Sequence, residues 1–406
     1  MSNLLTGSFQ LMKSLNRSLI LNLIREKGPI SRAEIAKITK LTPPTVSNLV
    51  KELLESNLVI ESDLGESQGG RKPTMLVINA KEFYVIGIDV GTKTIKGVVS
   101  DLNANIVIKK SLPISFPVTN DSFIDLMKTC IRQLLSISDI PLDKYIGIGV
   151  GMHGVVDVDT GTSLFAPNLQ LRNIPLKDEL EKEFKLPVKI ENDARAMALG
   201  ESWFGNGNGA DHIVCVNVGS GVGAGVIING KLFHGEHFIN GEVGHMTIDI
   251  NGPKCTCGNY GCLQTFTSGP AIAERIRREI SLGKKSIVAD MVNGDLDMID
   301  GKLIYEAALK GDPLSINALS EAGRYLGIGL TNLIHILNPK RIIVGGGVAN
   351  ANKFVLDSVR ETIQIRCLTQ SAKQTEILLS KLGEDATAIG AVTLILQELF
   401  SPTLAQ

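Results

Sequence analysis

One histidine and three cysteines follow one another closely in the second half of the chain. Their order is H-x9-C-x-C-x4-C, from His245 through Cys255 and Cys257 to Cys262. Imidazole and thiolate are the ligands of closed tetrahedral zinc sites, and this spacing lets a short loop wrap the ion. Unligated buried cysteines are the alternative, but the segment is polar, rich in glycine and without apolar periodicity. A disulfide is disfavoured, because we see no secretory segment and intracellular thiols stay reduced. The pattern predicts a loop held by a structural Zn2+.

Polar side chains flank this loop on both sides. Glu242 comes three residues before His245, and Gln264 comes two residues after Cys262. A metal that holds a histidine through one ring nitrogen leaves the other nitrogen for a bound molecule and orients the neighbouring residues. Converging polar groups of this kind suit a small molecule rich in hydroxyl groups, such as a sugar.

Composition sets broad limits on the fold. The chain has 406 residues, 44% of them hydrophobic, which suffices for large cores in two or three domains. Its 41 glycines favour tight loops beside strands, as α/β nucleotide-binding folds require. Residues 1–80 carry ten Lys/Arg and seven Asp/Glu, a net +3, against −4 for the rest; this asymmetry alone is weak evidence for nucleic acid. No apolar run approaches the roughly 20 residues of a membrane helix, so we expect a cytoplasmic protein.

The N-terminal segment shows start and stop signals for three helices. A first helix face is formed over residues 15–25 by Leu15, Leu19, Ile20, Leu23 and Ile24, and a Gly-Pro pair ends it. Ser31 and Glu34 form a capping box for a short helix reaching about residue 39. Thr42 is a good N-cap and Pro43 a natural first residue for a third helix up to about residue 56. The core face of that helix would be Val46, Leu49, Val50, Leu53 and Leu54.

Two helices joined by a tight turn indicate a helix-turn-helix. Alternation at residues 58–60 and 75–78 adds a hairpin with a basic Gly-Gly-Arg-Lys-Pro tip, which is typical of a wing. In such modules the start of the last helix enters the major groove, and an arginine at the tip can lie in a narrow minor groove. A three-helix packing unit with a solvated loop is the alternative, but cap, turn, helix lengths and wing all agree. We predict DNA contacts from Pro43, Thr45, Ser47, Asn48, Lys51 and Arg71.

From residue 84 the pattern changes to strands that end in turns of small residues. One apolar strand ends in Asp89-Val90-Gly91-Thr92, and a second ends in a glycine-rich loop after residue 218. Backbone N–H groups of such turns can hold phosphate. Two strand-and-loop units in one chain suggest duplicated α/β halves that face a cleft, and a third glycine run lies near residue 345. The turns are similar to those of sugar kinases of the actin-like fold, and this resemblance implies nucleotide binding by Asp89, Gly91, Thr92, Gly219, Gly221, Gly223, Gly345 and Gly346.

Between the halves, Glu191-Asn192-Asp193-Ala194 joins an apolar strand to an alanine-rich helix. Asp193 at a strand end in a cleft can accept a proton from a sugar hydroxyl. Asn192 or Asp193 can equally serve as the N-cap of the helix, and the sequence leaves both interpretations open. The loop that contains Asn168 is expected to line the same cleft.

These motifs, in this order, resemble the ROK family of repressors and sugar kinases over nearly the whole chain. The added N-terminal segment is similar to the repressor branch, such as xylose and N-acetylglucosamine repressors. The resemblance implies an α/β fold: a winged helix-turn-helix (residues 1–80) followed by two actin-like, ribonuclease H-like subdomains (81–200 and 201–406), the last helix returning to the first. It implies zinc on His245, Cys255, Cys257 and Cys262, and a sugar held by Asn168, Asn192, Asp193, Glu242, His245 and Gln264.

The chain departs from the family's kinases at three positions. Asp89-Val90-Gly91-Thr92 lacks a second glycine, Gln264 stands where the kinases carry glutamate, and Arg195 replaces the usual asparagine after Asn-Asp-Ala. A neutral Gln264 makes weaker hydrogen bonds to sugar hydroxyls than a carboxylate would. The three changes favour a regulator over an enzyme.

Three hypotheses about function follow. The leading one is a repressor of carbohydrate-utilisation genes, such as those of xylose metabolism, that binds a palindromic operator as a homodimer or a dimer of dimers and responds to a sugar effector. The second is a sugar kinase with an accessory DNA-binding domain, in which Asp193 is the catalytic base and ATP with Mg2+ the phosphoryl donor. The third is an activator that responds to a phosphorylated sugar or to a partner protein.

Overall fold

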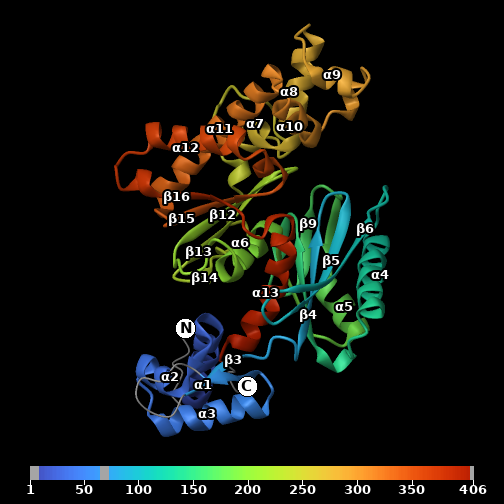
Figure 1. Cartoon of the computed structure of the whole chain (residues 1–406). Coiled ribbons are helices and arrows are strands. Elements are labelled where there is room, and N and C mark those ends of the chain that lie inside the picture. Colours follow the sequence, from blue (N-terminus) through green and yellow to red (C-terminus); the bar gives the residue numbers. More distant parts are fainter. Residues whose placement is uncertain (1–8, 65–72, 403–406) are drawn as a thin grey trace.

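The computed structural model describes residues 9–64 and 73–402, arranged as a small N-terminal head below a larger two-part body (Figure 1). Arg71, the predicted wing-tip contact, lies outside the described residues. Within the described ranges, no helix has both the length and the apolar character that crossing a bilayer requires.

The head is a winged helix-turn-helix with the predicted capping. Its elements are α1 (Phe9–Lys27), β1 (Ile30–Ser31), α2 (Arg32–Thr39), α3 (Pro43–Glu55), β2 (Val59–Leu64) and β3 (Thr74–Ile78), with sheet order β1-β3-β2. Ser31 Oγ accepts from Glu34 N at 3.2 Å, and Glu34 Oε2 accepts from Ser31 N at 2.9 Å, so the capping box is complete. Thr42 Oγ1 accepts from Thr45 N at 3.4 Å at the start of α3.

The core of the head is formed by α3 and by part of the apolar face of α1. Val46, Leu49, Val50 and Leu53 of α3 are buried, and Leu54 is half-buried against them. On α1, Ile20, Leu23 and Ile24 are buried, whereas Leu15 and Leu19 are 46% and 47% exposed. The periodicity predicted the helix, and Leu15 and Leu19 stay exposed because α2, α3 and β3 contact only part of the apolar face of α1.

The body contains two five-stranded sheets of the same design. In the first, with order β11-β7-β4-β5-β6, an antiparallel meander continues into parallel strands; its strands are β4 (Tyr84–Val90), β5 (Thr94–Asp101), β6 (Ile106–Pro113), β7 (Tyr145–Met152) and β11 (Val188–Asn192). The second, with order β14-β13-β12-β15-β16, repeats the design in β12 (Ile213–Val218), β13 (Val222–Ile228), β14 (Lys231–Leu232), β15 (Arg341–Gly345) and β16 (Glu376–Leu379). The duplicated halves expected from the sequence are therefore present.

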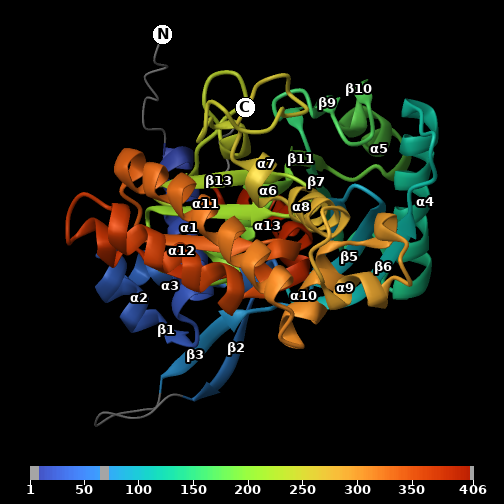
Figure 2. The ribbon, with the colours of Figure 1, turned by 90° about the horizontal axis from the view of Figure 1, so that it is seen from above.

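A small third sheet and the outer helices cover these halves. Strands β8 (Val155–Asp157), β9 (Thr162–Ala166) and β10 (Leu171–Ile174) form the small sheet beside the first half. The first sheet is flanked by α4 (Asn120–Ser138) and α5 (Leu176–Phe184). Figure 2 shows the second half covered by a helical layer, made of α7 (Gln264–Thr267), α8 (Gly269–Ser281), α9 (Ile287–Met291), α10 (Gly301–Leu309), α11 (Pro313–Leu337) and α12 (Lys353–Arg366).

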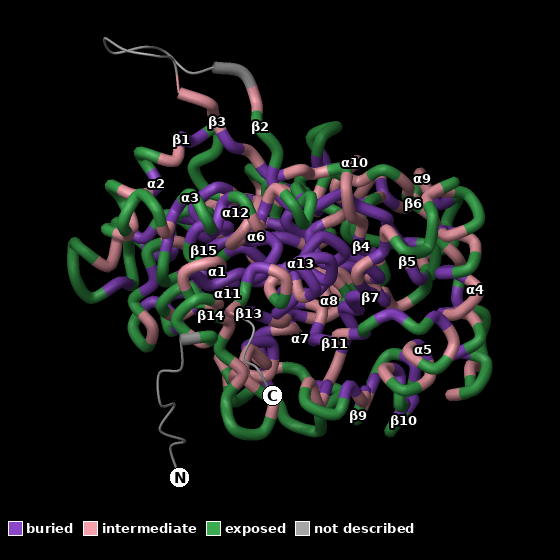
Figure 3. The backbone as a smooth tube through the Cα atoms, turned by 90° about the horizontal axis from the view of Figure 1, so that it is seen from below, coloured by how far each residue is buried: buried purple, intermediate pink, exposed green. Residues whose placement is uncertain are grey.

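Two helices, α6 (Asp193–Phe204) and α13 (Ala386–Phe400), pack against each other between the two large sheets (Figure 1). Both are largely buried, as the purple tube at the centre of Figure 3 shows. A glycine is required at their crossing, because a Cβ on Gly390 would lie 1.8 Å from the carbonyl oxygen of Ala196. The C-terminal helix thus returns to β4 and β7 of the first sheet and continues down to the head.

Candidate metal, sugar and DNA sites

The structure brings together the four residues of the His-Cys pattern. One ligand atom from each of His245, Cys255, Cys257 and Cys262 lies within 4.8 Å of all the others. Cys255 Sγ is 3.6 Å from His245 Nδ1, and Cys257 Sγ is 3.7 Å from Cys262 Sγ. The edge of a tetrahedron with Zn–S bonds of about 2.3 Å measures about 3.8 Å. All three cysteines are free thiols, so the cluster is compatible with a structural zinc ion.

Hydrogen bonds inside the loop favour a thiolate at Cys255. Burial raises the pKa of this thiol, but hydrogen bonds from Cys257 and from the Gln264 amide outweigh it and lower the pKa to about 6. Gln264 Nε2 lies 3.2 Å from Cys255 Sγ. The side chain predicted to contact a sugar therefore donates to a thiol of the cluster through its nitrogen, and its Oε1 faces the Gly221 turn.

His245 connects the cysteine cluster to Glu242. Its Nδ1 faces Cys255, while its Nε2 lies 3.9 Å from Glu242 Oε2. Partial burial and the negative charge of Asp193 raise the pKa of Glu242, although His245 acts in the opposite direction. The second ring nitrogen of the histidine thus lies on the side of Glu242.

At the junction of β11 and α6, the capping role falls to Asn192 rather than to Asp193. Asn192 Oδ1 accepts from the backbone N–H groups of Ala194 (3.0 Å) and Arg195 (3.2 Å), and its Nδ2 donates to Gly154 O at 3.0 Å. Asp193, the first helical residue, keeps its carboxylate free of the cap. Its charge contributes to raising the pKa of both Asp89 in the first half and Glu242 in the second, so Asp193 acts electrostatically on a carboxyl group of each half.

Asn168 lies in the turn after β9 and is exposed. A Cβ on Gly154 would lie 2.7 Å from Pro167 Cδ, so this turn packs beside the glycine whose carbonyl Asn192 contacts. Gln264, His245 and Glu242 are connected through Cys255, the charge of Asp193 acts on Glu242, and Asn192 contacts Gly154, beside which lies Pro167, the neighbour of Asn168.

A buried charged network behind this site was not predicted from the sequence. Arg195 Nε pairs with Glu191 Oε1 at 2.7 Å, and the two side chains are only 1% and 2% exposed. Arg195 Nη1 donates to the carbonyls of Phe238 (2.8 Å) and Asn240 (3.2 Å), and His234 Nε2 lies 2.6 Å from Glu191 Oε2. Burial alone would raise the pKa of Glu191, but the hydrogen bond from His234 and the charge of Arg195 lower it. The network holds the loop that leads to Glu242.

The candidate nucleotide residues fall at the ends of neighbouring strands. Asn217 of β12 pairs with Gly223 of β13 and Gly345 of β15, and Gly219 N donates to Gly221 O at 2.9 Å. A Cβ on Gly346 (φ +86°) would lie 2.4 Å from Asn217 Oδ1, so this glycine serves a close approach within the protein.

Asp89, at the end of β4, forms an ion pair with the side chain of Lys96. Lys96 Nζ lies 3.9 Å from Asp89 Oδ2 and 3.5 Å from Asp385 Oδ1. Gly91 and Thr92 form the adjoining turn between β4 and β5. Burial raises the pKa of Asp89 to about 7, with Lys96 opposing and Asp193 and Asp385 adding to the effect.

The predicted DNA-binding face is available on α3. Pro43, Ser47, Asn48 and Lys51 are exposed, and Thr45 is half-buried. The ion pair of Lys51 with Glu55 (3.7 Å) joins side chains that are 76% and 63% exposed, so the lysine remains free to change partner.

A winged head on a duplicated α/β body with a His-Cys loop defines a DNA-binding regulator built on a sugar-kinase fold. A model of the ROK family matches residues 85–398, and a model of winged helix-turn-helix DNA-binding domains matches residues 14–60. The chain is 37% identical to the xylose repressor of Bacillus subtilis strain 168 over 390 residues, covering 95% of this chain and 96% of that protein. It is 31% identical to the N-acetylglucosamine repressor of Escherichia coli O157:H7 over 400 residues, covering 98% and 97%.

Solved structures of ROK family proteins share the fold of this chain. A ROK family transcriptional regulator described as a homologue of the E. coli MLC protein superposes with a TM-score of 0.83 at 29% identity, covering 96% of this chain and 97% of that one. A ROK family glucokinase from Streptomyces griseus, solved with glucose and AMPPNP, gives a TM-score of 0.70 at 33% identity over 77% of this chain and 98% of its own. The chain belongs to the ROK family, and its head gives it the architecture of the family's transcriptional regulators.

Proposed function

We propose that the chain is a sugar-responsive transcriptional repressor. It binds a palindromic operator as a homodimer or a dimer of dimers, and a sugar bound between the two halves of the body changes its affinity for DNA. The observation that carries this proposal is the presence, on one chain, of an exposed recognition face on α3 and of a connected polar group around Asp193, Glu242 and His245.

The DNA contacts come from α3 and the wing. Pro43, Thr45, Ser47, Asn48 and Lys51 lie at the start and on the outer face of α3, where a recognition helix meets base edges and phosphates. Arg71 belongs to the proposal through its place in the sequence alone. Loss of one lysine–phosphate contact lowers operator affinity and reduces the salt slope by about 1.

A matched pair of lysines tests this face. Lys51 and Lys302 each form an exposed i,i+4 pair with a glutamate, at 3.7 Å and 3.9 Å. We expect Lys51→Ala, Asn48→Ala and Arg71→Ala to weaken binding to a palindromic duplex selected in vitro with this chain, whereas Lys302→Ala binds like wild type. If all four variants bind the duplex as tightly as wild type, the head is not the DNA-binding domain.

The effector site consists of Asn168, Asn192, Asp193, Glu242, His245 and Gln264. A zinc ion bound by His245, Cys255, Cys257 and Cys262 would hold the imidazole of His245 so that its Nε2 faces the sugar. The role of this zinc ion would be structural. Because relatives are named xylose and N-acetylglucosamine repressors, a thermal-shift screen starts with D-xylose, D-glucose and N-acetyl-D-glucosamine. A ligand of the native state raises the melting temperature by mass action; no shift with any of them would contradict the choice of effector class.

A sugar kinase is the second candidate, and the observation that favours it is the carboxylate of Asp193, which is not used in the helix cap and acts electrostatically on Asp89. Asp193 would take the proton of the attacking hydroxyl, and the residues around Asp89, Gly219 and Gly345 would hold ATP and Mg2+. ADP release measured across the same sugars decides between the candidates, because turnover that disappears in Asp193→Asn would establish the kinase.

The domain division that we propose is residues 1–80 for the head, 81–200 for the first subdomain and 201–406 for the second, with α13 returning to the first. A repressor of this kind acts in the cytoplasm. Limited proteolysis that releases a stable fragment starting near residue 81 would support the first boundary.

A further inference from the structure

Helix α1 of the head contacts the body at two places. Ser18 Oγ and Asn22 Nδ2 both donate to the carbonyl of Phe400 at the end of α13, the second at 2.8 Å. About one turn further along α1, the guanidinium carbon of Arg25 lies 3.8 Å from the centroid of the Trp203 ring near the end of α6. Phe400 packs edge-on against the same ring, with centroids 5.8 Å apart.

Stacking holds Arg25 at the second attachment. Its side chain is only 14% exposed, and within the described residues its Nε is buried without a hydrogen-bond partner. Nη2 pairs with Glu26 at 3.0 Å on the outer side. A guanidinium over an indole face is a cation–π contact, which is stronger where water is excluded. The guanidinium carbon also lies 5.5 Å from the centroid of the Phe400 ring, so the attachment depends on two aromatic rings, of which Trp203 is the nearer.

Helix α6 connects this ring to the candidate sugar site. Asp193 is its first residue, and Trp203, ten residues later, lies about 15 Å along the axis at 1.5 Å per residue. Residues 194–201 are buried, and the close crossing at Gly390 leaves no space for α6 to bend toward α13. At its other end, Arg195 holds the loop that leads to Glu242. A closely packed helix transmits a displacement as a unit.

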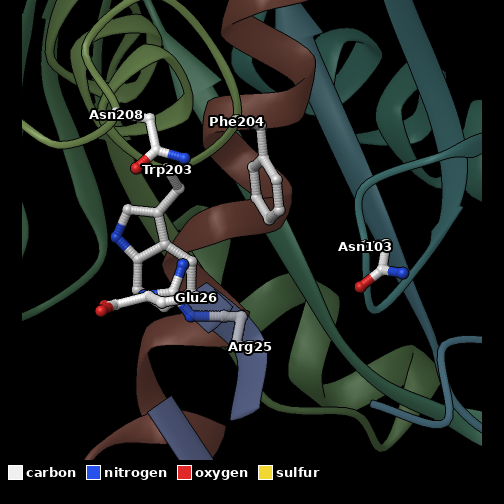
Figure 4. Close-up of a pocket in the computed structure, with 6 residues that line it drawn as sticks. All are labelled: Arg25, Glu26, Asn103, Trp203, Phe204 and Asn208. Carbon is white, nitrogen blue, oxygen red and sulfur yellow. The ribbon is translucent and has the colours of Figure 1, made fainter. Parts of the chain in front are cut away.

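The joint also has room to rearrange. A cavity of about 320 Å³ lies beside the stack, and Figure 4 shows Arg25 and Trp203 at one side of it. Head and body share its walls: Arg25, Glu26, Asn103, Trp203, Phe204 and Asn208. The space adjoins Arg25, and the hydrogen bonds of Ser18 and Asn22 to the Phe400 carbonyl do not involve the guanidinium.

We propose that Arg25 and Trp203 are the positioning residues through which occupancy of the sugar site, carried by α6, sets the placement of the DNA-reading head. This inference rests on the proposed function, because it names the connection between the two sites. The α13 attachment acts as the pivot, and the Arg25–Trp203 stack is the contact that differs between the DNA-binding and released arrangements. A ligand acts only through such a difference between states.

Two readouts test the proposal on the full chain. The first is the ratio of operator dissociation constants with and without saturating D-xylose, and the second is tryptophan emission, which reports on this joint alone because Trp203 is the chain's one tryptophan. In wild type we expect a ratio of about tenfold or more, within the usual range of allosteric coupling, and by reciprocity an emission change with either xylose or operator DNA.

In Arg25→Ala and Trp203→Leu the ratio should fall below about threefold, while the xylose-induced melting shift is retained. Trp203→Phe keeps an aromatic face and should recover most of the ratio. Lys27→Ala, an exposed charge two residues from Arg25, should behave like wild type. If Trp203→Leu does not fold, Arg25→Ala gives the result alone.

An unchanged ratio in Arg25→Ala would overturn the inference, as would wild-type emission that is insensitive to both xylose and operator DNA. Failure of the proposed function looks different: wild type itself would then show no effect of any bound sugar on operator affinity.

Discussion

The buried pair of Glu191 and Arg195 should be among the most costly places to remove a charge from this protein. Their side chains are 2% and 1% exposed and their atoms are 2.7 Å apart. Replacing Arg195 by methionine leaves Glu191 buried with His234 as its remaining side-chain partner. Breaking a buried pair from one side costs about 3–5 kcal/mol, and because His234 remains, we expect a loss of about 3 kcal/mol from the free energy of unfolding.

A double-mutant cycle in urea, followed by far-ultraviolet circular dichroism, measures this coupling. Glu191→Gln in the Arg195→Met background removes the stranded charge, so the double variant should be more stable than Arg195→Met, with a coupling energy of about 2 kcal/mol. The control is Lys189→Met on the same strand, which breaks an ion pair whose side chains are 41% and 53% exposed and should cost less than about 1 kcal/mol. Additive effects, or a loss from Arg195→Met no larger than that of the control, would refute the reasoning.

Three further predictions concern the metal, the head and the acidic site. Cys257→Ser should lose bound zinc by elemental analysis and with it the melting shift by sugar, and freshly purified wild type without zinc would remove the basis for this. Thr42→Ala should destabilise the head by about 1 kcal/mol, because it removes the N-cap of α3; hydrogen exchange in α3 that does not accelerate would contradict it. Since the pKa of Asp89 is raised to about 7, the folded protein keeps a proton that the unfolded chain releases, and stability from this group is lost as the pH rises from about 4 to about 7. Asp89→Asn should therefore be more stable than wild type above about pH 7 and show no advantage near about pH 4, and a difference independent of pH in thermal melts would contradict this.

The sequence predicted the helix starts and the His-Cys cluster, because each depends on residues that are close together in the chain. Ser31 with Glu34, and Thr42 before Pro43, placed two helix starts correctly because a cap involves residues three positions apart. The His-Cys spacing predicted a compact cluster for the same reason, since a single loop supplies all four side chains.

What the sequence could not predict depends on partners far along the chain. Arg195 was recognisable as a departure from the family pattern, but its contacts to Phe238 and Asn240 lie more than 40 residues away. Leu15 and Leu19 have the spacing of a buried face, yet the head is too small to cover all of α1. The stack of Arg25 on Trp203 has no local signature, because the fold alone brings these residues together.

Adding D-xylose to a preformed complex of the protein with its selected palindromic duplex, followed by fluorescence anisotropy of the labelled DNA, tests the central claim most directly. Wild type should release the DNA, whereas Asp193→Asn should hold it at the same sugar concentration. Release by both proteins alike, or a wild-type complex that binds xylose and stays intact, would show that the site around Asp193 does not control the DNA-reading head.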